Sequence, residues 1–147
     1  MNTEMSEVVV KMQIEAPPEM VFPYFTDPIK MAQWMGSQVV LEPRPGGVYQ
    51  VQVSPRDIAR GEYLEVTPPS RVVFTFGWIG SPLPPGASTV EVTLEPHEGG
   101  TLVVLRHFNL PEPAREQHLQ GWRHYLARLE IAATGGNPGP DPFAEGM

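Results

Sequence analysis

The longest periodic segment of the chain is PEPAREQHLQGWRHYLARLEIAA, residues 111–133. Its apolar side chains recur at intervals of three and four residues, which places them along one side of an α-helix; they are Leu119, Trp122, Leu126, Leu129 and Ala133. A glycine pair at 135–136 predicts the end of this helix. Because a helix with one continuous apolar stripe must pack against another apolar surface, we expect the rest of the chain to form that surface.

The segments before this helix alternate apolar and polar residues with a period of two, the pattern of β-strands with one buried face. We predict seven strands, at residues 8–14, 39–42, 48–53, 58–66, 72–78, 88–95 and 101–108. Prolines near their starts and Gly36 at the end indicate two short helices, at 16–22 and 27–35. Turns rich in glycine and proline separate the later strands, which is typical of an antiparallel meander.

This order of elements predicts an α+β protein with a helix-grip fold. A curved antiparallel sheet of about seven strands should wrap around the long C-terminal helix, with the two short helices after strand one closing one end. The length of 147 residues favours a single domain, which we place at residues 1–134. The remaining residues, 135–147, contain few apolar side chains, and we expect them to form a disordered or loosely docked tail.

Composition excludes several classes of protein. The apolar share of 41% and charged share of 18% are typical of a soluble protein, and the start MNTE lacks the features of a signal peptide, so we expect a cytoplasmic location. The absence of cysteine excludes disulfides, thiolate metal sites and a cysteine nucleophile. A net charge of −7 would repel a phosphate backbone, so no nucleic-acid partner is expected.

Four segments, distributed over nearly the whole domain, are informative through their order and spacing. They are IEAPPEMVFPYFTDPIKMAQW at 14–34, RPGGVY at 44–49, GEYLEVTPPSRVVFTF at 61–76, and the pairs Gly121-Trp122 and Arg128-Leu129 in the last helix. Together they resemble the START-like (SRPBCC) superfamily, and within it the domain related to the C-terminal part of the activator of heat shock protein 90 ATPase. The resemblance covers roughly residues 8–134.

The resemblance implies a cavity between the sheet and the C-terminal helix. In many relatives this cavity takes a hydrophobic or amphipathic small molecule. Relatives also include enzymes and the co-chaperone itself, so the fold alone does not select one activity. The co-chaperone carries a separate N-terminal domain that this chain, starting at strand one, lacks, and we therefore expect a chaperone-activating role to be the weaker interpretation.

Aromatic side chains concentrate where such a cavity would lie. Large rings supply apolar area and their few polar atoms fix the orientation of a ligand, although the same rings could equally fill an ordinary core. The predicted ligand-binding residues are Trp34, Tyr49, Phe74, Phe76, Trp78, Arg106, His107, His118, Trp122 and Tyr125. Within this set, we expect Phe74 and Phe76 to face the C-terminal helix.

The last strand leaves one question open, because both of its faces are mostly apolar. Either Arg106 or His107 must point inward, and the period alone does not decide which. An inward Arg106 would favour a carboxylate or phenolate on the ligand, whereas an outward one would be solvated or paired with an acid. His107 and His118 could also meet in the cavity, where a neutral imidazole can transfer protons.

Motifs for metal binding and catalysis are missing from the sequence. His118 and His124 lie six positions apart and so do not share a helix face; we expect no metal and no cofactor. No nucleophile elbow, Walker loop or dinucleotide fingerprint occurs, and Glu62 and Glu65 should lie on opposite faces of one strand, which excludes a paired-carboxylate site. Whether the protein is an enzyme stays uncertain, and the sequence does not favour it.

Two smaller features concern the cavity itself. The loop GSPLPPG at 80–86 is too long for a tight hairpin, and we expect it to form a rim at the mouth, with Leu83 as its one large apolar contact. Gly121 costs roughly 1 kcal/mol in a helix interior, and we expect it to allow another backbone to approach closely.

The predicted function is binding of a small hydrophobic or amphipathic molecule. The alternatives are a chaperone-linked protein-interaction module, with a protein partner, and an aromatase/cyclase-like enzyme.

Overall fold

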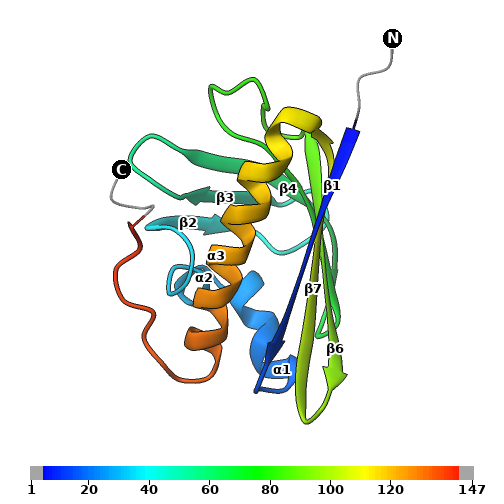
Figure 1. The fold of residues 1–147 in the computed structure, drawn as a ribbon, viewed down its shortest axis with the longest axis vertical. Coiled ribbons are helices and arrows are strands. Elements are labelled where there is room, and N and C mark those ends of the chain that lie inside the picture. The colour runs from blue at the N-terminus through cyan, green and yellow to red at the C-terminus, as the bar shows by residue number, and fades with distance from the viewer. Residues whose placement is uncertain (1–4, 143–147) are drawn as a thin grey trace.

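The computed structural model describes residues 5–142, so the first four residues and the end of the predicted tail, 143–147, lie outside the described part. Seven antiparallel strands form one sheet in the order β1-β7-β6-β5-β4-β3-β2 (Figure 1). The strands are β1 Met5–Ile14, β2 Gln38–Leu41, β3 Val48–Gln52, β4 Ile58–Thr67, β5 Arg71–Phe76, β6 Ser88–His97 and β7 Gly100–Pro111. The helices are α1 Pro18–Val21, η1 Phe22–Phe25, α2 Pro28–Met31, η2 Glu112–Ala114 and α3 Arg115–Ala133. The predicted helix-grip fold is confirmed.

Helix α3 packs across one face of the sheet (Figure 1). Of the predicted apolar stripe, Trp122, Leu126, Leu129 and Ala133 are buried, and Leu119 is partly buried against the same core. Full burial of one such large side chain contributes about 1.5–3 kcal/mol, so the stripe is a main source of the attraction between helix and sheet.

The helix begins later than predicted. Pro111 is still the last residue of β7, and residues 112–114 form a single 3₁₀ turn before α3 starts at Arg115. Pro113 lacks a backbone N–H and is tolerated in such a first turn, where the donor would have no helical partner.

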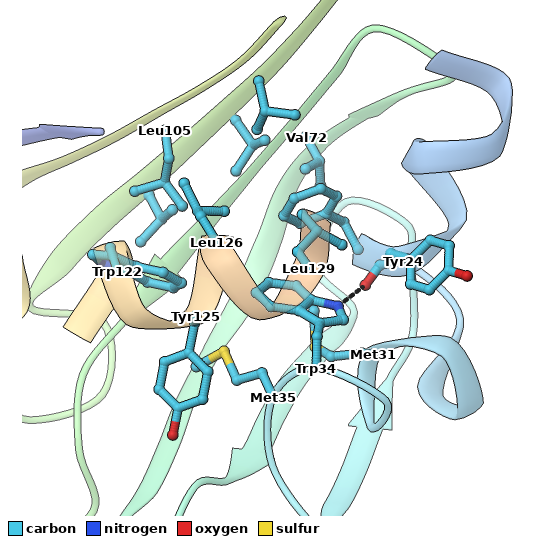
Figure 2. Close-up of a cluster of buried hydrophobic side chains, with 14 of the residues drawn as sticks. Tyr24, Met31, Trp34, Met35, Val72, Leu105, Trp122, Tyr125, Leu126 and Leu129 are labelled. Carbon is cyan, nitrogen blue, oxygen red and sulfur yellow. Dashed lines mark hydrogen bonds between the residues drawn. The ribbon is translucent and has the colours of Figure 1, made fainter. Parts of the chain in front are cut away.

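The short helices close one end of the space beneath α3. The Tyr24 hydroxyl donates to the carbonyl of Ala132 at 3.2 Å. The Trp34 indole N–H donates to the carbonyl of Tyr24 at 3.0 Å, as Figure 2 shows. The Tyr63 hydroxyl of β4 donates to the carbonyl of Phe25 at 2.9 Å. These bonds tie the helices both to the end of α3 and to the sheet, so this end is filled by protein.

Two irregularities in the sheet change which side chains face the core. Between the pairs Ser6↔Leu110 and Val8↔His107, one residue of β1 opposes two of β7, and Asn109 there has a φ of 62°. This bulge shifts the alternation, so that Leu110 as well as His107 is fully buried.

The second irregularity, in β4, changes the relative positions of Glu62 and Glu65, which were expected on opposite faces of the strand. The register of β4 shifts between Tyr63 and Glu65, and Tyr63 is buried. Glu62 therefore lies on the same outer face as Glu65, not on the opposite one. Glu65 accepts hydrogen bonds there from Thr67 and from Arg71, at 2.9 and 3.0 Å.

The described part of the tail, residues 135–142, runs back along α3 (Figure 1). Arg128 of α3 donates to the carbonyl of Gly139 at 3.0 Å and to that of Trp34 at 3.1 Å. The Asp141 side chain is buried and accepts a hydrogen bond from the Tyr125 hydroxyl at 2.6 Å. These contacts hold residues 138–141 against the helix. No helix within residues 5–142 combines the length and the apolar character that crossing a membrane would require.

Candidate functional site

A cavity of about 970 Å³ opens between the first half of α3 and the sheet. Side chains of α3 and β5, with the loop that follows β5, supply its aromatic part: Phe76, Trp78, His118, Trp122 and Tyr125. Parts of the loops 53–57 and 79–83 line its other side. The volume lies within the roughly 300–1,000 Å³ of small-molecule sites, so a ligand of that size could be accommodated.

Eight of the ten predicted site residues separate into two groups. Phe76, Trp78, His118, Trp122 and Tyr125 line the cavity, as just described. The aromatic residues Trp34, Tyr49 and Phe74 do not line it; each is at most 1% exposed, and the rings of Tyr49 and Phe74 stack with centroids 4.0 Å apart. Their end of the interior is filled by the short helices, so these three residues belong to the packed core. Phe74 and Phe76 are both buried on the side of the sheet that carries α3.

Of the two candidates on the last strand, His107 is the one that points inward, but it does not line the cavity, which corrects its predicted role in ligand binding. Its ring is fully buried behind Phe76 and Trp122, with centroids 5.0 and 6.1 Å away. A neutral imidazole can be buried at modest cost when both of its nitrogens are hydrogen-bonded, whereas a guanidinium could not leave water so cheaply.

Arg106 points to the outer face of the sheet and is not a cavity residue, which corrects its predicted role in ligand binding. It pairs with Glu7 and, at 3.3 Å, with Glu91. Arg71 extends the row by pairing with Glu91 and, at 3.0 Å, with Glu65. Five neighbouring strands thus contribute one charged side chain each, with alternating sign. The charge of Arg106 is balanced within this row, so no ligand is needed to explain its presence.

His107 sits in a hydrogen-bonded chain that defines its protonation state. The Trp122 indole N–H, which can only donate, lies 2.9 Å from Nδ1, so Nδ1 accepts. The proton of the neutral ring is then on Nε2, which donates to the Ser88 hydroxyl at 2.8 Å, and that hydroxyl donates to the carbonyl of Phe76 at 2.9 Å. Burial, with a smaller contribution from His118, lowers the pKa of His107 to about 3.

His118 forms a similar pair with the second tryptophan of the cavity. The Trp78 indole N–H donates to Nε2 at 3.0 Å, and Nδ1 donates to the carbonyl of Ala114 at 2.7 Å. Burial lowers the pKa of His118, although the bond to Ala114 opposes that shift. The rings of His107 and His118 do meet, with centroids 5.2 Å apart. Since the lone pair of each neutral ring is already occupied, the predicted proton transfer by these residues is not supported.

The third polar group of the aromatic lining is the hydroxyl of Tyr125. Figure 2 shows that this side chain extends from α3 away from Leu126 and Leu105, with its hydroxyl pointing outward from the core cluster. The hydroxyl donates to Asp141, which also lies 2.8 Å from Nε2 of His124. Burial, together with the bond to Asp141, raises the pKa of Tyr125. The phenol therefore stays protonated at neutral pH.

Several lining residues were not predicted from the sequence. They include Met35, Ser54, Arg56, Asp57, Ile79, Gln117, Gln120 and Gly121. The loop residues carry no periodic signal, but Gly121 did stand out as a glycine inside a helix. Its predicted explanation was wrong: a Cβ placed on Gly121 would meet no atom within 4 Å, so no second backbone approaches it.

The loop 80–86 contributes to the mouth of the cavity. Leu83 lines the cavity and is only 7% exposed, and its carbonyl accepts a hydrogen bond from the backbone N–H of Trp78 at 2.8 Å. The loop is thus anchored to Trp78, which lies two residues beyond the end of β5 and whose ring forms part of the aromatic wall. Within residues 5–142, no three His, Cys, Asp or Glu side chains gather in a way that could hold a metal ion.

A curved antiparallel sheet that grips a C-terminal helix over a lined cavity defines a START-like protein. The comparison with family models agrees with this class and narrows it. The chain belongs to the family described as activator of Hsp90 ATPase homolog 1-like protein, whose model matches residues 15–134.

Solved structures of similar proteins support this assignment. The chain is 44% identical to an AHSA1-like protein from Rhizobium etli, with a TM-score of 0.76, over 98% of this chain and 91% of that one. It is 27% identical to CalU16 from Micromonospora echinospora, with a TM-score of 0.76, over 91% of this chain and 69% of that one. It is 25% identical to DynU16, a protein of the dynemicin biosynthetic locus, with a TM-score of 0.78, over 90% of this chain and 48% of that one. No curated protein matches the chain at a significant level.

Proposed function

We propose that the chain acts as a single ligand-binding domain that takes a small hydrophobic or amphipathic molecule into the cavity beneath α3. The observation that carries this proposal is the contrast between a cavity of about 970 Å³ at one end of the interior and close packing at the other. A space of this size, lined by aromatic rings together with a few polar side chains, favours a ligand.

The relatives are consistent with a small molecule as partner. DynU16 comes from a biosynthetic locus, where small molecules are made and handled. The identity to DynU16 is 25%, so the cavity itself supplies the main argument.

A protein-interaction module is the second hypothesis, prompted by the name of the family. Such a module would present a continuous apolar patch. The exposed large apolar side chains of the described residues lie on several different segments: Val9, Met20, Ile29, Val40, Leu64, Ile79 and Ile131. A protein partner and a cytoplasmic location stay predictions from the sequence.

An enzyme is the third hypothesis, and the histidine geometry gives it little support. Each ring beside the cavity uses its acceptor nitrogen for a tryptophan N–H. A general base would first have to break one of these bonds.

The proposal can be tested with two complementary measurements. Native mass spectrometry of freshly purified protein distinguishes protein that carries a bound small molecule from protein that carries none. The empty protein should then bind one equivalent of anilinonaphthalene sulfonate, with energy transfer from Trp78, which lines the cavity.

Matched variants locate the binding site of this probe. Ile79 is 47% exposed and lines the cavity, whereas Ile29 is 77% exposed and does not line it. Ile79→Asp should weaken probe binding by about tenfold or more, equivalent to roughly 1.4 kcal/mol, and Ile29→Asp should leave it unchanged. Equal effects of the two variants, or no binding by wild-type protein whose cavity is empty, would exclude this function and favour the interaction module.

A further inference from the structure

Gly121 occupies an unusual position for a glycine. It lies within α3, where glycine is less favourable than alanine, and its φ is not in the left-handed region that would require a glycine. A Cβ at this position would meet no atom within 4 Å, so packing does not require a glycine either. The residue lines the cavity, and the missing side chain therefore leaves bare helix backbone at its wall.

Aromatic rings line the same cavity as this bare backbone. Trp122 and Tyr125 follow Gly121 on α3, and Phe76 and Trp78 also line the cavity. Phe76 meets Trp78 edge to face at 5.3 Å and Trp122 in a tilted arrangement at 5.7 Å. Ring pairs at about 4.5–7 Å gain energy beyond area burial, and an inserted planar ring could form further pairs of this kind. A flexible alkyl chain would gain only area, and it would lose conformational entropy on binding.

The hydrogen-bonding atoms of these rings are already engaged. The indole N–H groups of Trp78 and Trp122 donate to His118 and His107, and the hydroxyl of Tyr125 donates to Asp141. A polar group of a ligand placed against these rings would lose its water without gaining a partner from these donors. The exposed lining residues are a better environment for it: Arg56, Asp57, Gln117 and Gln120.

We propose that Gly121 selects the shape of the ligand, by leaving a slot against α3 that takes a planar aromatic ring system whose hydrogen-bonding groups are confined to one end. That end stays among the polar residues at the mouth. This inference rests on the proposed function and specifies the class of molecule bound.

The test compares three carboxylates by calorimetric titration of the wild-type protein. Naphthoate and decanoate each carry one carboxylate at one end and differ in the shape of the apolar body. Naphthalene dicarboxylate, with its two groups at opposite ends, adds a charge that would have to lie against the aromatic rings. Naphthoate should bind at least tenfold more tightly than either of the other two.

Two substitutions on α3 test the role of Gly121 itself. Gly121→Leu should abolish naphthoate binding and Gly121→Ala should weaken it severalfold, while the melting temperature of the alanine variant stays equal to that of wild type or rises. Ala127→Leu is the matched control, because Ala127 is an exposed position on the same helix that does not line the cavity. It should leave binding unchanged.

The possible failures are distinguishable. Equal binding of naphthoate and decanoate, or unchanged naphthoate binding by a folded Gly121→Leu variant, would overturn this inference and leave small-molecule binding in place. Failure of the empty wild-type protein to bind any of the three carboxylates and the fluorescent probe would overturn both proposals.

Discussion

The two ends of the space beneath α3 are built from similar residues, but one end is filled by protein and the other is open. One end contains Phe25, Trp34, Tyr49, Tyr63 and Phe74 and is closed by the short helices. The other contains Phe76, Trp78, Trp122 and Tyr125 and is open. Aromatic content alone does not distinguish a core from a cavity; what differs is whether another segment of the chain arrives to fill the space.

The ends also differ in what their polar atoms bind. At the closed end, Trp34 and Tyr63 donate to backbone carbonyls. At the open end, Trp122 and Trp78 donate to histidines, and Tyr125 donates to a carboxylate. Backbone carbonyls do not titrate over the ordinary pH range, whereas imidazoles and carboxylates do. Of the two ends, the open one should therefore respond more strongly to pH.

The largest effect is expected for Trp122→Ala, which removes a ring that belongs to both the stripe of α3 and the cavity wall. We expect a loss of about 3–5 kcal/mol in the free energy of unfolding, the usual range for truncating a buried tryptophan. Trp122 is 4% exposed, and its loss also leaves Nδ1 of His107 without its donor. Urea denaturation measures this change. An unchanged midpoint would show that the open end contributes little to the stability of the fold.

The second expected effect is a pH dependence caused by His107. Its pKa is about 3 in the folded protein against 6.5 for an ordinary histidine, so below pH 6.5 the unfolded chain takes up a proton that the native state does not. The stabilisation is complete above pH 6.5 and decreases as the pH falls, by about 1.4 kcal/mol per unit at most. By pH 5 the loss should be roughly 2 kcal/mol.

A variant isolates this contribution from that of other titrating groups. The pKa of His118 is also lowered, so it acts in the same direction. The slope of the unfolding free energy against pH reports how many more protons the unfolded state binds than the native state. Between pH 5 and 6.5, His107→Gln should lower this number by about one, measured by urea denaturation at several pH values. Parallel curves for wild type and variant would contradict the buried, neutral state of His107.

Removing the hydroxyls at the two ends should cost different amounts of stability, with a difference of about 1 kcal/mol. Tyr125→Phe removes a bond to the buried carboxylate of Asp141 and should cost about 1.5–3 kcal/mol. Tyr24→Phe removes a bond of 3.2 Å to the carbonyl of Ala132 and should cost about 0.5–1.5 kcal/mol. Thermal unfolding of both variants gives the comparison. If Tyr24→Phe were the more damaging change, the docking of Asp141 on α3 would not be an important stabilising contact.

The smallest expected effect is a gain in stability. Gly121→Ala should increase the free energy of unfolding by about 0.5–1 kcal/mol, because alanine is favoured in a helix and its Cβ has space. Gly77→Ala is the control, and it should decrease the free energy of unfolding, because a Cβ there would lie 1.8 Å from the carbonyl oxygen of Pro84. Differential scanning calorimetry can follow both. A destabilised Gly121→Ala variant would indicate a packing role for this glycine after all.

The sequence by itself determined the order of the elements and the helix-grip architecture. Periods of two and of three to four residues arise from neighbouring positions, and turn residues mark where each period stops. The apolar stripe of α3 could therefore be predicted, as could the sidedness of Phe74 and Phe76. Five of the predicted site residues line the cavity for the same reason, because they lie on the faces that α3 and the end of β5 turn toward each other.

Only the tertiary structure decided which aromatic residues border open space. Trp34, Tyr49 and Phe74 are buried because the short helices fill their end, and the loops 53–57 and 79–83 line the cavity because the sheet brings them opposite α3. The inward position of His107 and the outward one of Arg106 depended on strand register and on partners far along the chain, such as Glu7. Local periodicity cannot encode such choices, since the energy of burying a group depends on what distant segments place around it.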